Sequence, residues 1–209
     1  KKLHIEAYII PTSDPHKSEY IPDYWKTRQW LSGFTGSAGT AVVTLKHAGL
    51  WTDSRYFIQA EKQLENPFKL HKLKTRTPEY QDWILEDLNF GATIGIDGRL
   101  FSSSEIENFE KKAAQKQIRI LDVGDLFEAI WIKRPEIPCG FIIEHSEQFS
   151  GRSITKKLED IREKLEEKNI TCTLISALDE VAWAVNLRGN DIEYNPVFSS
   201  YLFVSQNES

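Results

Sequence analysis

A loop with regularly spaced glycines that runs directly into a strand constrains this chain more than any other stretch. Gly33, Gly36 and Gly39 recur at every third position, and a β-branched run follows over residues 39–44. Glycine permits positive φ angles and close approach of a second segment, so the loop is expected to turn tightly against neighbouring structure. The run behind it is typical of a buried strand. The fold is therefore expected to be organised around residues 31–44.

A polar and aromatic cluster, Trp-Thr-Asp-Ser-Arg-Tyr-Phe, follows at residues 51–57. Asp53 is expected to cap a helix that begins at Ser54. Arg55 has two interpretations. It pairs with Asp53 or a surface carboxylate, or it faces a ligand and holds a carboxylate through two parallel hydrogen bonds.

Segments with strand and helix character alternate through the first 131 residues, which predicts an α/β layered fold. Two further helix starts are expected, one at Thr77 followed by Pro78 and one at a Ser104–Glu107 capping box. The expected strands cover residues 4–10, 39–44, 49–52, 68–72, 93–96 and 118–121, and the expected helices cover 22–31, 54–64, 78–88, 104–113 and 125–131.

A charged, proline-rich stretch at residues 133–138 interrupts this pattern and is the best linker candidate. We therefore expect a first domain over residues 1–135 and the first part of a second domain over 136–209. The second segment is expected to contain a helix at 153–168, a strand at 171–175, a helix at 178–185 and a strand at 198–204.

The second segment repeats the first in order. In both, a strand leads through a polar turn to an aromatic helix, then to Leu-Ser-Gly at 31–33 or Leu-Arg-Gly at 187–189, and then to a buried type of strand. The repeat predicts that the helix matching 153–168 lies before residue 1, and that the second copy continues beyond Ser209. The sequence contains no methionine, even at its start, which also indicates a fragment.

Composition excludes several classes of function. The formal charge is −5 and the pI about 5.6, so there is no basic footprint for nucleic acid. No apolar run reaches the roughly 18–20 residues that span a bilayer, and the start has no signal-peptide core. Cys139 and Cys172 lack metal-type spacing. A disulfide or a metal pair stays open for them, but free thiols in a cytoplasmic protein are the expectation.

Other chemistries fit the residues poorly. The glycine loop lacks both the dinucleotide-binding order and the Gly-Lys-Ser/Thr ending of a phosphate loop, so close packing is favoured over nucleotide binding. Ser37 does not sit in a Gly-x-Ser-x-Gly elbow. The histidines are scattered without the spacing of a metal pair. His16, in the polar loop after the first strand, is the one retained as a candidate site residue.

These motifs together resemble the N-terminal part of Xaa-Pro aminopeptidases (aminopeptidase P), in their long, three-domain form. The resemblance covers nearly the whole chain, and the motifs occur in the family's order. They are Ala7–Pro11, Asp14, His16 and Ser18–Tyr20, Ser32–Thr40, Trp51–Phe57, Arg134–Pro135, Ala177–Glu180, Ala182–Trp183, Asn186–Gly189 and Asn195–Phe198.

The resemblance implies a creatinase/prolidase N-terminal domain, with a mixed, ribonuclease H-like sheet flanked by helices, and the start of a second such domain. It implies a parent enzyme that releases the residue preceding proline from peptides with proline at the second position. The reaction would use two divalent ions, usually manganese, in a C-terminal domain beyond Ser209. None of those ligands maps onto this sequence, which would be inactive alone.

The resemblance further implies that the first domain provides homodimer contacts and restricts the active-site mouth to short peptides. Arg55, and with it His16, is the expected substrate-binding group. A different class of function stays open, because related domains occur as an inactive binding module in a histone-chaperone subunit. Prolidase and creatinase-type amidinohydrolases fit less well, since they lack the second repeat.

Overall fold

The computed structural model describes residues 3–74 and 78–206. Its internal packing divides the chain into two units. Unit 1 comprises Lys1–Pro15 and Trp25–Pro135, and unit 2 comprises His16–Tyr24 and Glu136–Ser209. The short segment His16–Tyr24 therefore packs with unit 2, although it precedes most of unit 1 in the sequence.

Six strands form one mixed sheet in unit 1. They are β1 (Ala7–Pro11), β2 (Thr40–Thr44), β3 (Ala48–Thr52), β4 (Phe68–Lys72), β5 (Thr93–Ile96) and β6 (Arg119–Asp122). They lie in the order β4-β3-β2-β1-β5-β6. The pairs β1–β2 and β2–β3 are antiparallel, whereas β3–β4, β1–β5 and β5–β6 are parallel. The expected α/β fold with a mixed, helix-flanked sheet is confirmed.

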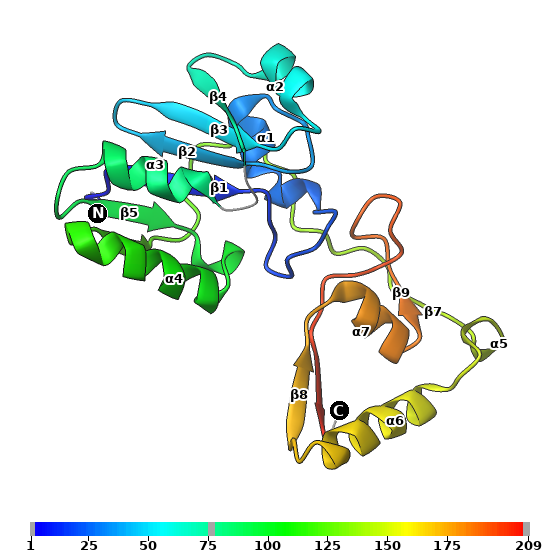
Figure 1. Cartoon of the computed structure of the whole chain (residues 1–209). Helices are drawn as coiled ribbons and strands as arrows, with labels where there is room; N and C mark the ends of the chain where they lie inside the picture. The colour runs from blue at the N-terminus through cyan, green and yellow to red at the C-terminus, as the bar shows by residue number, and fades with distance from the viewer. Residues whose placement is uncertain (1–2, 75–77, 207–209) are drawn as a thin grey trace. The chain divides into compact units, whose positions relative to one another are not determined.

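Helices cover both faces of this sheet. They are α1 (Thr27–Ser32), α2 (Phe57–Gln63), α3 (Glu79–Asp87) and α4 (Ser103–Ala113), with 3-10 turns η2 (Gly98–Leu100) and η3 (Ala114–Lys116). A further 3-10 turn, η1 (Asp23–Trp25), lies where the chain passes from the unit 2 segment back into unit 1. Successive side chains of β1 point to opposite faces. Ile9 packs in a cluster with residues of α3 and α4, whereas Ile10 packs with Phe34 and with Ala60 of α2. Figure 1 shows α3 and α4 together along one side of the sheet.

Several predicted helix starts are wrong. The helix expected over 22–31 is split into η1 and α1. The helix expected from Ser54 begins only at Phe57, because Asp53 is used in a turn instead. An Asp53 carboxylate oxygen accepts a hydrogen bond from the Arg55 backbone N–H at 3.1 Å, and the Asp53 carbonyl accepts one from the Tyr56 N–H at 3.0 Å.

The remaining starts shift for similar local reasons. The capping box is formed by Ser102 and Glu105, two residues before the predicted pair, since α4 begins at Ser103. Pro78 occupies the N-cap of α3 rather than its first helical position, and Thr77 lies outside the described residues. The segment 125–131 forms turns rather than a helix, because the Asp125 carboxylate accepts the Phe127 N–H at 2.8 Å.

The glycine loop is held by a buried arginine that sequence reasoning did not single out. Arg28 of α1 is only 4% exposed. Its Nη1 and Nη2 donate to the carbonyl oxygens of Phe34 and Gly36 at 2.8 and 2.5 Å, and its Nε donates to Thr12 Oγ1 at 2.7 Å. Burial lowers the pKa of Arg28 to about 10. One side chain thus ties α1, the end of β1 and the loop together.

Close packing explains the loop's glycines, as predicted. A Cβ on Gly36 would lie 2.2 Å from the Phe34 ring, and Gly33 adopts a positive φ of 74° at the end of α1. The loop therefore has no room for side chains at these two positions.

A stack of aromatic rings lies across β3 and β4 in unit 1. The rings of Trp51 and His71 are parallel with centroids 4.0 Å apart, and Trp83 of α3 packs on both. A Cβ on Gly49 would lie 2.6 Å from the Trp51 indole, so glycine is needed at that position. Burial lowers the pKa of His71, and the charges of Lys69 and His47 lower it further.

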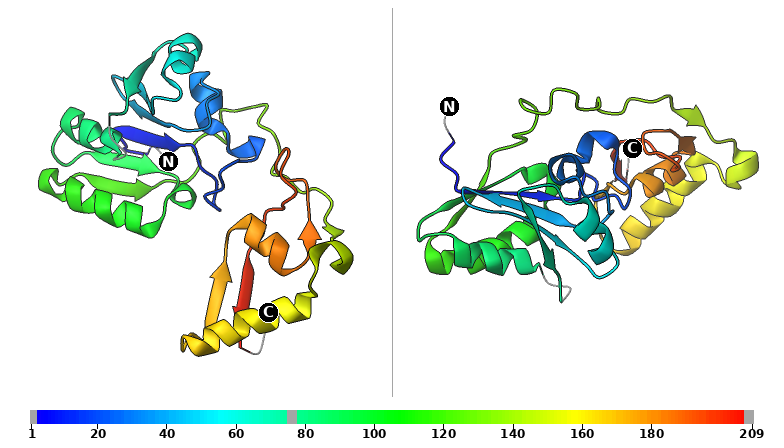
Figure 2. Two further views of the ribbon diagram at one scale, coloured as in Figure 1. Left: turned by 45° about the vertical axis from the view of Figure 1, so that its right-hand side comes forward. Right: turned by 90° about the horizontal axis from the view of Figure 1, so that it is seen from above.

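Unit 2 contains two small antiparallel sheets of two strands each, together with helices. Its elements are β7 (Ile143–Glu144), α5 (Glu147–Ser150), α6 (Ile154–Glu167), β8 (Cys172–Ile175), α7 (Leu178–Ala184), β9 (Leu187–Arg188) and β10 (Leu202–Ser205). β8 pairs with β10, and β7 with β9. Figure 2 shows β8 and β10 side by side. β7 and α5 were not predicted from the sequence.

A buried lysine joins the two longer helices of unit 2. Lys157 of α6 is 1% exposed, and its Nζ donates to the Trp183 carbonyl at 2.8 Å and to Asn186 Oδ1 at 2.6 Å. Burial lowers the pKa of this amine. Ile154, an apolar residue at the start of the same helix, is 38% exposed.

The β8–β10 pair leaves one of its faces open. Leu174 and Phe203 are cross-strand partners, and they are 62% and 50% exposed. In unit 1 the cross-strand partners Ile9 and Val42 belong to the cluster under α3 and α4, and they are 1% and 0% exposed. The opposite face of the unit 2 pair packs on α7 through Ile175. The two strand pairs therefore differ in how many of their faces are covered.

Replacing Arg28 by methionine tests its role in the loop. Arg28→Met leaves two carbonyl oxygens and a hydroxyl without their donor, and each unsatisfied buried group costs roughly 1–3 kcal/mol. Urea unfolding followed by tryptophan fluorescence should show a loss of about 3 kcal/mol or more. Lys111→Met, at an exposed cation of α4, is the control and should stay within about 0.5 kcal/mol. A loss below about 1 kcal/mol for Arg28→Met would contradict this role.

The pKa of His71 predicts a pH dependence of stability. The pKa of His71 is lower in the folded chain than in the unfolded chain. As the pH falls through about 6.5, His71 therefore binds a proton in the unfolded chain before it does so in the folded chain. The free energy of unfolding should therefore fall between pH 7 and 5. His71→Phe retains a ring for stacking and does not titrate, so its decrease over this range should be smaller. An equal decrease in both proteins would refute the prediction.

Candidate functional site

Arg55, the principal candidate from the sequence, lies in the turn that joins β3 to α2. β3 is fully buried, and the chain reaches the surface directly after Thr52. The turn closes through the bond from the Tyr56 N–H to the Asp53 carbonyl, and α2 then buries Ala60 beneath it. This arrangement presents the Arg55 side chain at the surface, 68% exposed.

Asp53 holds one edge of the Arg55 guanidinium. Nε donates to Oδ1 and Nη2 donates to Oδ2, both at 2.9 Å. The pKa of the Asp53 carboxyl is lowered, chiefly by the side-chain hydrogen bond from Arg55. The same contact raises the pKa of the already very basic Arg55. The first interpretation from the sequence, pairing with Asp53, is therefore present, and a ligand-facing role remains a proposal.

The Arg55 guanidinium packs on an aromatic ring that is itself held by the glycine loop. The guanidinium carbon lies 5.2 Å from the Tyr56 ring centroid. The Tyr56 hydroxyl is 2.7 Å from Ser37 Oγ in the loop, and the Tyr56 ring packs edge-on against Phe34. Phe34 is in turn a partner of Arg28. A chain of direct contacts therefore joins the buried Arg28 to the exposed Arg55.

A second set of polar side chains joins the glycine loop to α2. Thr35 of the loop donates from its backbone N–H to Gln63 Oε1 at 3.0 Å, and its hydroxyl accepts from Gln59 at 2.9 Å. These groups bind one another and fasten the loop to α2.

Unit 1 contains a second copy of the Asp-x-Arg arrangement, which sequence reasoning missed. Arg99 donates from Nε and Nη2 to Asp97 at 2.9 and 2.7 Å, as Arg55 does to Asp53. The signal was available, since Asp-Ser-Arg-Tyr-Phe at 53–57 and Asp-Gly-Arg-Leu-Phe at 97–101 share a pattern. Here, however, a further carboxylate is supplied by the chain, because Arg99 Nη2 lies 3.8 Å from Asp125 Oδ2.

Asp125 also fastens the end of unit 1. It forms a buried ion pair with Arg134, directly before the linker prolines. The Asp97 pair is thus part of a chain of ion pairs that continues through Asp125 to Arg134, whereas the Asp53 pair has no further ion-pair partner among the described residues and is more exposed.

His16, the second predicted site residue, belongs to unit 2. Its Nδ1 lies 3.0 Å from the Ser176 carbonyl oxygen, which can only accept, so Nδ1 carries the proton. Its ring stacks on Tyr201 at 4.4 Å. These contacts join the loop after β1 to the elements of unit 2. Arg55 and His16 lie in different units, and a substrate-binding role for His16 remains a proposal.

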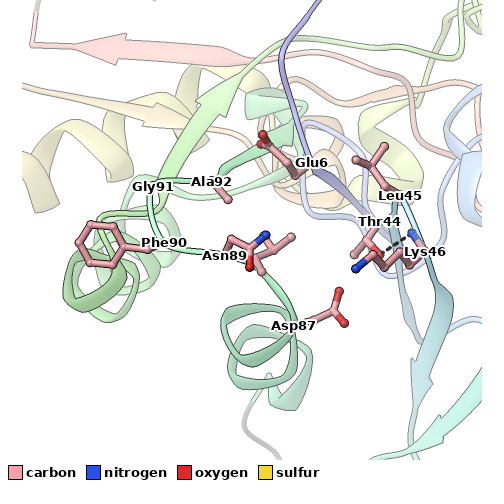
Figure 3. A pocket seen from close by; sticks show the side chains of 10 residues that line it. Glu6, Thr44, Leu45, Lys46, Asp87, Asn89, Phe90, Gly91 and Ala92 are labelled. Carbon is pink, nitrogen blue, oxygen red and sulfur yellow. Dashed lines mark hydrogen bonds between the residues drawn. The ribbon is translucent and has the colours of Figure 1, made fainter.

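A cavity of about 190 Å³ lies elsewhere in unit 1, between the β2–β3 turn and the loop that follows α3. Figure 3 shows the side chain of Asp87, the last residue of α3, pointing toward the turn that carries Lys46. Leu45 and Phe90 on its rim are exposed. Neither predicted site residue lines this cavity.

Residues 3–74 and 78–206 contain neither a metal-binding group of side chains nor a membrane-spanning helix. Within these ranges no three side chains of His, Cys, Asp or Glu are grouped so that they could hold a metal ion. No helix in the same ranges is long and apolar enough to cross a membrane. Both cysteines, Cys139 and Cys172, are free and exposed.

Comparison with known families gives two matches, one in each half of the chain. Residues 1–130 and residues 133–209 each match a model of the creatinase/prolidase N-terminal domain.

Two relatives that match along the chain are named as Xaa-Pro aminopeptidases. A probable Xaa-Pro aminopeptidase P of Fusarium vanettenii is 42% identical over 209 residues, which cover 98% of this chain and 34% of the relative. Xaa-Pro aminopeptidase ApepP of Drosophila melanogaster is 41% identical over 207 residues, with the same coverage of 98% and 34%. The chain therefore spans about a third of the length of the curated relatives it matches.

A solved structure agrees with these relatives. The X-prolyl aminopeptidase of Caenorhabditis elegans, described as a cytosolic enzyme with a dinuclear active site, superposes with a TM-score of 0.90 at 36% identity, covering 97% of this chain and 33% of that one. The chain belongs to the creatinase/prolidase N-terminal domain family, and over its whole length it corresponds to the N-terminal third of long-form Xaa-Pro aminopeptidase P.

Proposed function

We propose that this chain is the substrate-gating, non-catalytic region of a cytoplasmic enzyme that releases the residue preceding proline from short peptides. The observation that carries the proposal is identity of about 40% along the whole chain to proteins named as Xaa-Pro aminopeptidases. Those names favour an enzyme over the inactive binding module. The described residues offer no metal donor set, so the two divalent ions, with manganese proposed, would be bound by other parts of the parent protein.

Unit 1 would contribute in two ways to that enzyme. It would provide homodimer contacts, for which the family resemblance is the support and sedimentation of the parent protein is the test. It would also present Arg55 to the peptide. Support for the second role is the geometry of Arg55, which is exposed, charged at every physiological pH and fixed by Asp53 and Tyr56. His16 is proposed, on the family resemblance, as a lesser substrate-binding residue.

Removing Arg55 tests the gating role. In the full-length parent enzyme, Arg55→Ala should raise KM or lower kcat by at least about tenfold, which corresponds to about 1.4 kcal/mol of transition-state stabilisation. Steady-state kinetics on a short Xaa-Pro peptide measure the effect. Lys72→Ala removes another exposed cation that pairs with a single carboxylate, Glu61, and should leave the kinetics unchanged. Unchanged kinetics for Arg55→Ala would sink the proposal.

We also propose that unit 2 is the first part of a longer domain. Its support is the open apolar pair Leu174–Phe203, whose counterparts Ile9 and Val42 are covered by two helices in unit 1. Residues that follow in the parent protein would supply the matching cover. An exposed apolar pair on a two-stranded sheet is otherwise a site for aggregation.

The domain proposal predicts opposite effects in two contexts. In the 209-residue chain, the double change Leu174→Ser and Phe203→Ser should reduce aggregation and dye binding, and alter unfolding by no more than about 0.5 kcal/mol. In the full-length parent it should cost at least about 2 kcal/mol, because the pair is then buried. Leu45→Ser, at an exposed turn residue, should be neutral in both. Equally small effects of the double change in both contexts would contradict the proposal.

A further inference from the structure

The Arg55 guanidinium has a second hydrogen-bonding edge beyond the one that Asp53 occupies. A guanidinium carries five N–H donors in a planar fork. Asp53 takes the Nε–H and one Nη2–H. The two Nη1–H groups and the second Nη2–H form another edge, whose outer pair of parallel donors matches the two oxygens of a carboxylate. In the part of the chain that the structure describes, Asp53 is the only carboxylate within ion-pair distance of Arg55.

The second Asp-x-Arg copy places two carboxylates within ion-pair distance of one arginine. Arg99 is held by Asp97 through the same two nitrogens, and a second carboxylate, Asp125, lies 3.8 Å from its Nη2. The same local geometry therefore accommodates two carboxylates on one arginine. In the Arg55 copy, the described residues supply no second carboxylate within ion-pair distance, so this position is open to a carboxylate of a ligand.

Charge balance at the Asp53–Arg55 pair favours a ligand with a single negative charge. The Asp53–Arg55 pair is neutral overall, so a singly charged carboxylate adds one negative charge, whereas a doubly charged phosphate would meet stronger repulsion from Asp53. A peptide carbonyl offers one oxygen and uses the fork less fully. The Tyr56 ring, held in place by the hydrogen bond between its hydroxyl and Ser37, limits the motion of the guanidinium before a ligand binds.

We propose that Arg55 binds a free carboxylate of the peptide substrate and that Asp53 is the residue that positions Arg55. This inference rests on the proposed substrate role of Arg55. The carboxylate is that of the peptide C-terminus or of an acidic side chain near it, which share the same chemistry. Selection for a free chain end would favour short peptides, whose carboxylate can reach the site while their N-terminus is at the metal ions.

The test uses the full-length parent enzyme and three matched peptides. One ends in a free acid, one ends in an amide, and one ends in an amide but carries glutamate at its last position. The variants are Arg55→Ala, Arg55→Lys and Asp53→Asn, with Arg99→Lys as the matched control for loss of a fork. Thermal unfolding of each variant identifies any that fails to fold, and such a variant is set aside in favour of the remaining two.

The wild-type enzyme should show a KM about tenfold lower for the free acid than for the amide. Arg55→Ala and Arg55→Lys should raise KM for the free acid about tenfold, leave kcat nearly unchanged and leave the amide unaffected. Asp53→Asn should raise KM for the free acid about threefold, again without a change for the amide. Arg99→Lys should preserve the acid preference. If the effects appear with the glutamate peptide instead, the carboxylate is that of a side chain.

Two other outcomes would overturn the inference and are distinguishable from each other. If Arg55→Ala raises KM equally for the acid and the amide peptides, Arg55 contacts the substrate but does not select a carboxylate. No loss for any peptide would refute both the inference and the substrate role of Arg55. Wild-type kinetics for Asp53→Asn, with a clear effect of Arg55→Lys, would remove Asp53 as a positioning residue.

Discussion

The buried guanidinium of Arg28 is the interaction on which the rest of unit 1 depends. Within residues 3–74 and 78–206, no carboxylate accepts a hydrogen bond from this guanidinium. Its N–H groups donate instead to two main-chain carbonyls of the glycine loop and to the Thr12 hydroxyl. Hydrogen bonds to a charged donor are stronger than neutral ones, so this contact fixes the path of the loop. The loop then supports Tyr56 through Ser37, and Tyr56 supports Arg55. The geometry of an exposed residue is thus set by a buried one.

Two copies of one local motif perform different roles in the same unit. In the Asp97–Arg99 copy the arginine meets a second carboxylate, Asp125, which also pairs with Arg134 beside the linker. In the Asp53–Arg55 copy the arginine remains at the surface. The pairing with Asp53 is compatible with both a structural and a binding role, because one edge of the fork suffices for it. What distinguishes the copies is the supply of the second carboxylate.

Much of the fold could be predicted because its signals are local. Strands β4 and β5 match their predicted ranges. In β4 apolar and polar residues alternate, with Phe68 and Leu70 two positions apart, and β5 is a short buried run that ends before Asp97 and Gly98. Helix starts were less predictable, because Asp53 and Asp125 can hydrogen-bond to nearby backbone in turns as readily as they cap helices. The importance of Arg28 was hidden, since nothing local distinguishes a buried arginine from a surface one. The site residues Arg55 and His16 came from motif and resemblance, and their substrate roles remain proposals.

The most direct test of the central claim is a crystal structure of the full-length parent enzyme with a short, uncleaved Xaa-Pro peptide that has a free C-terminus. The account predicts a peptide carboxylate bound to the outer edge of Arg55, through Nη1 and Nη2, with the Asp53 contact retained on the other edge. An Asp or Glu side chain of another domain on that edge, with the peptide carboxylate elsewhere, would contradict it.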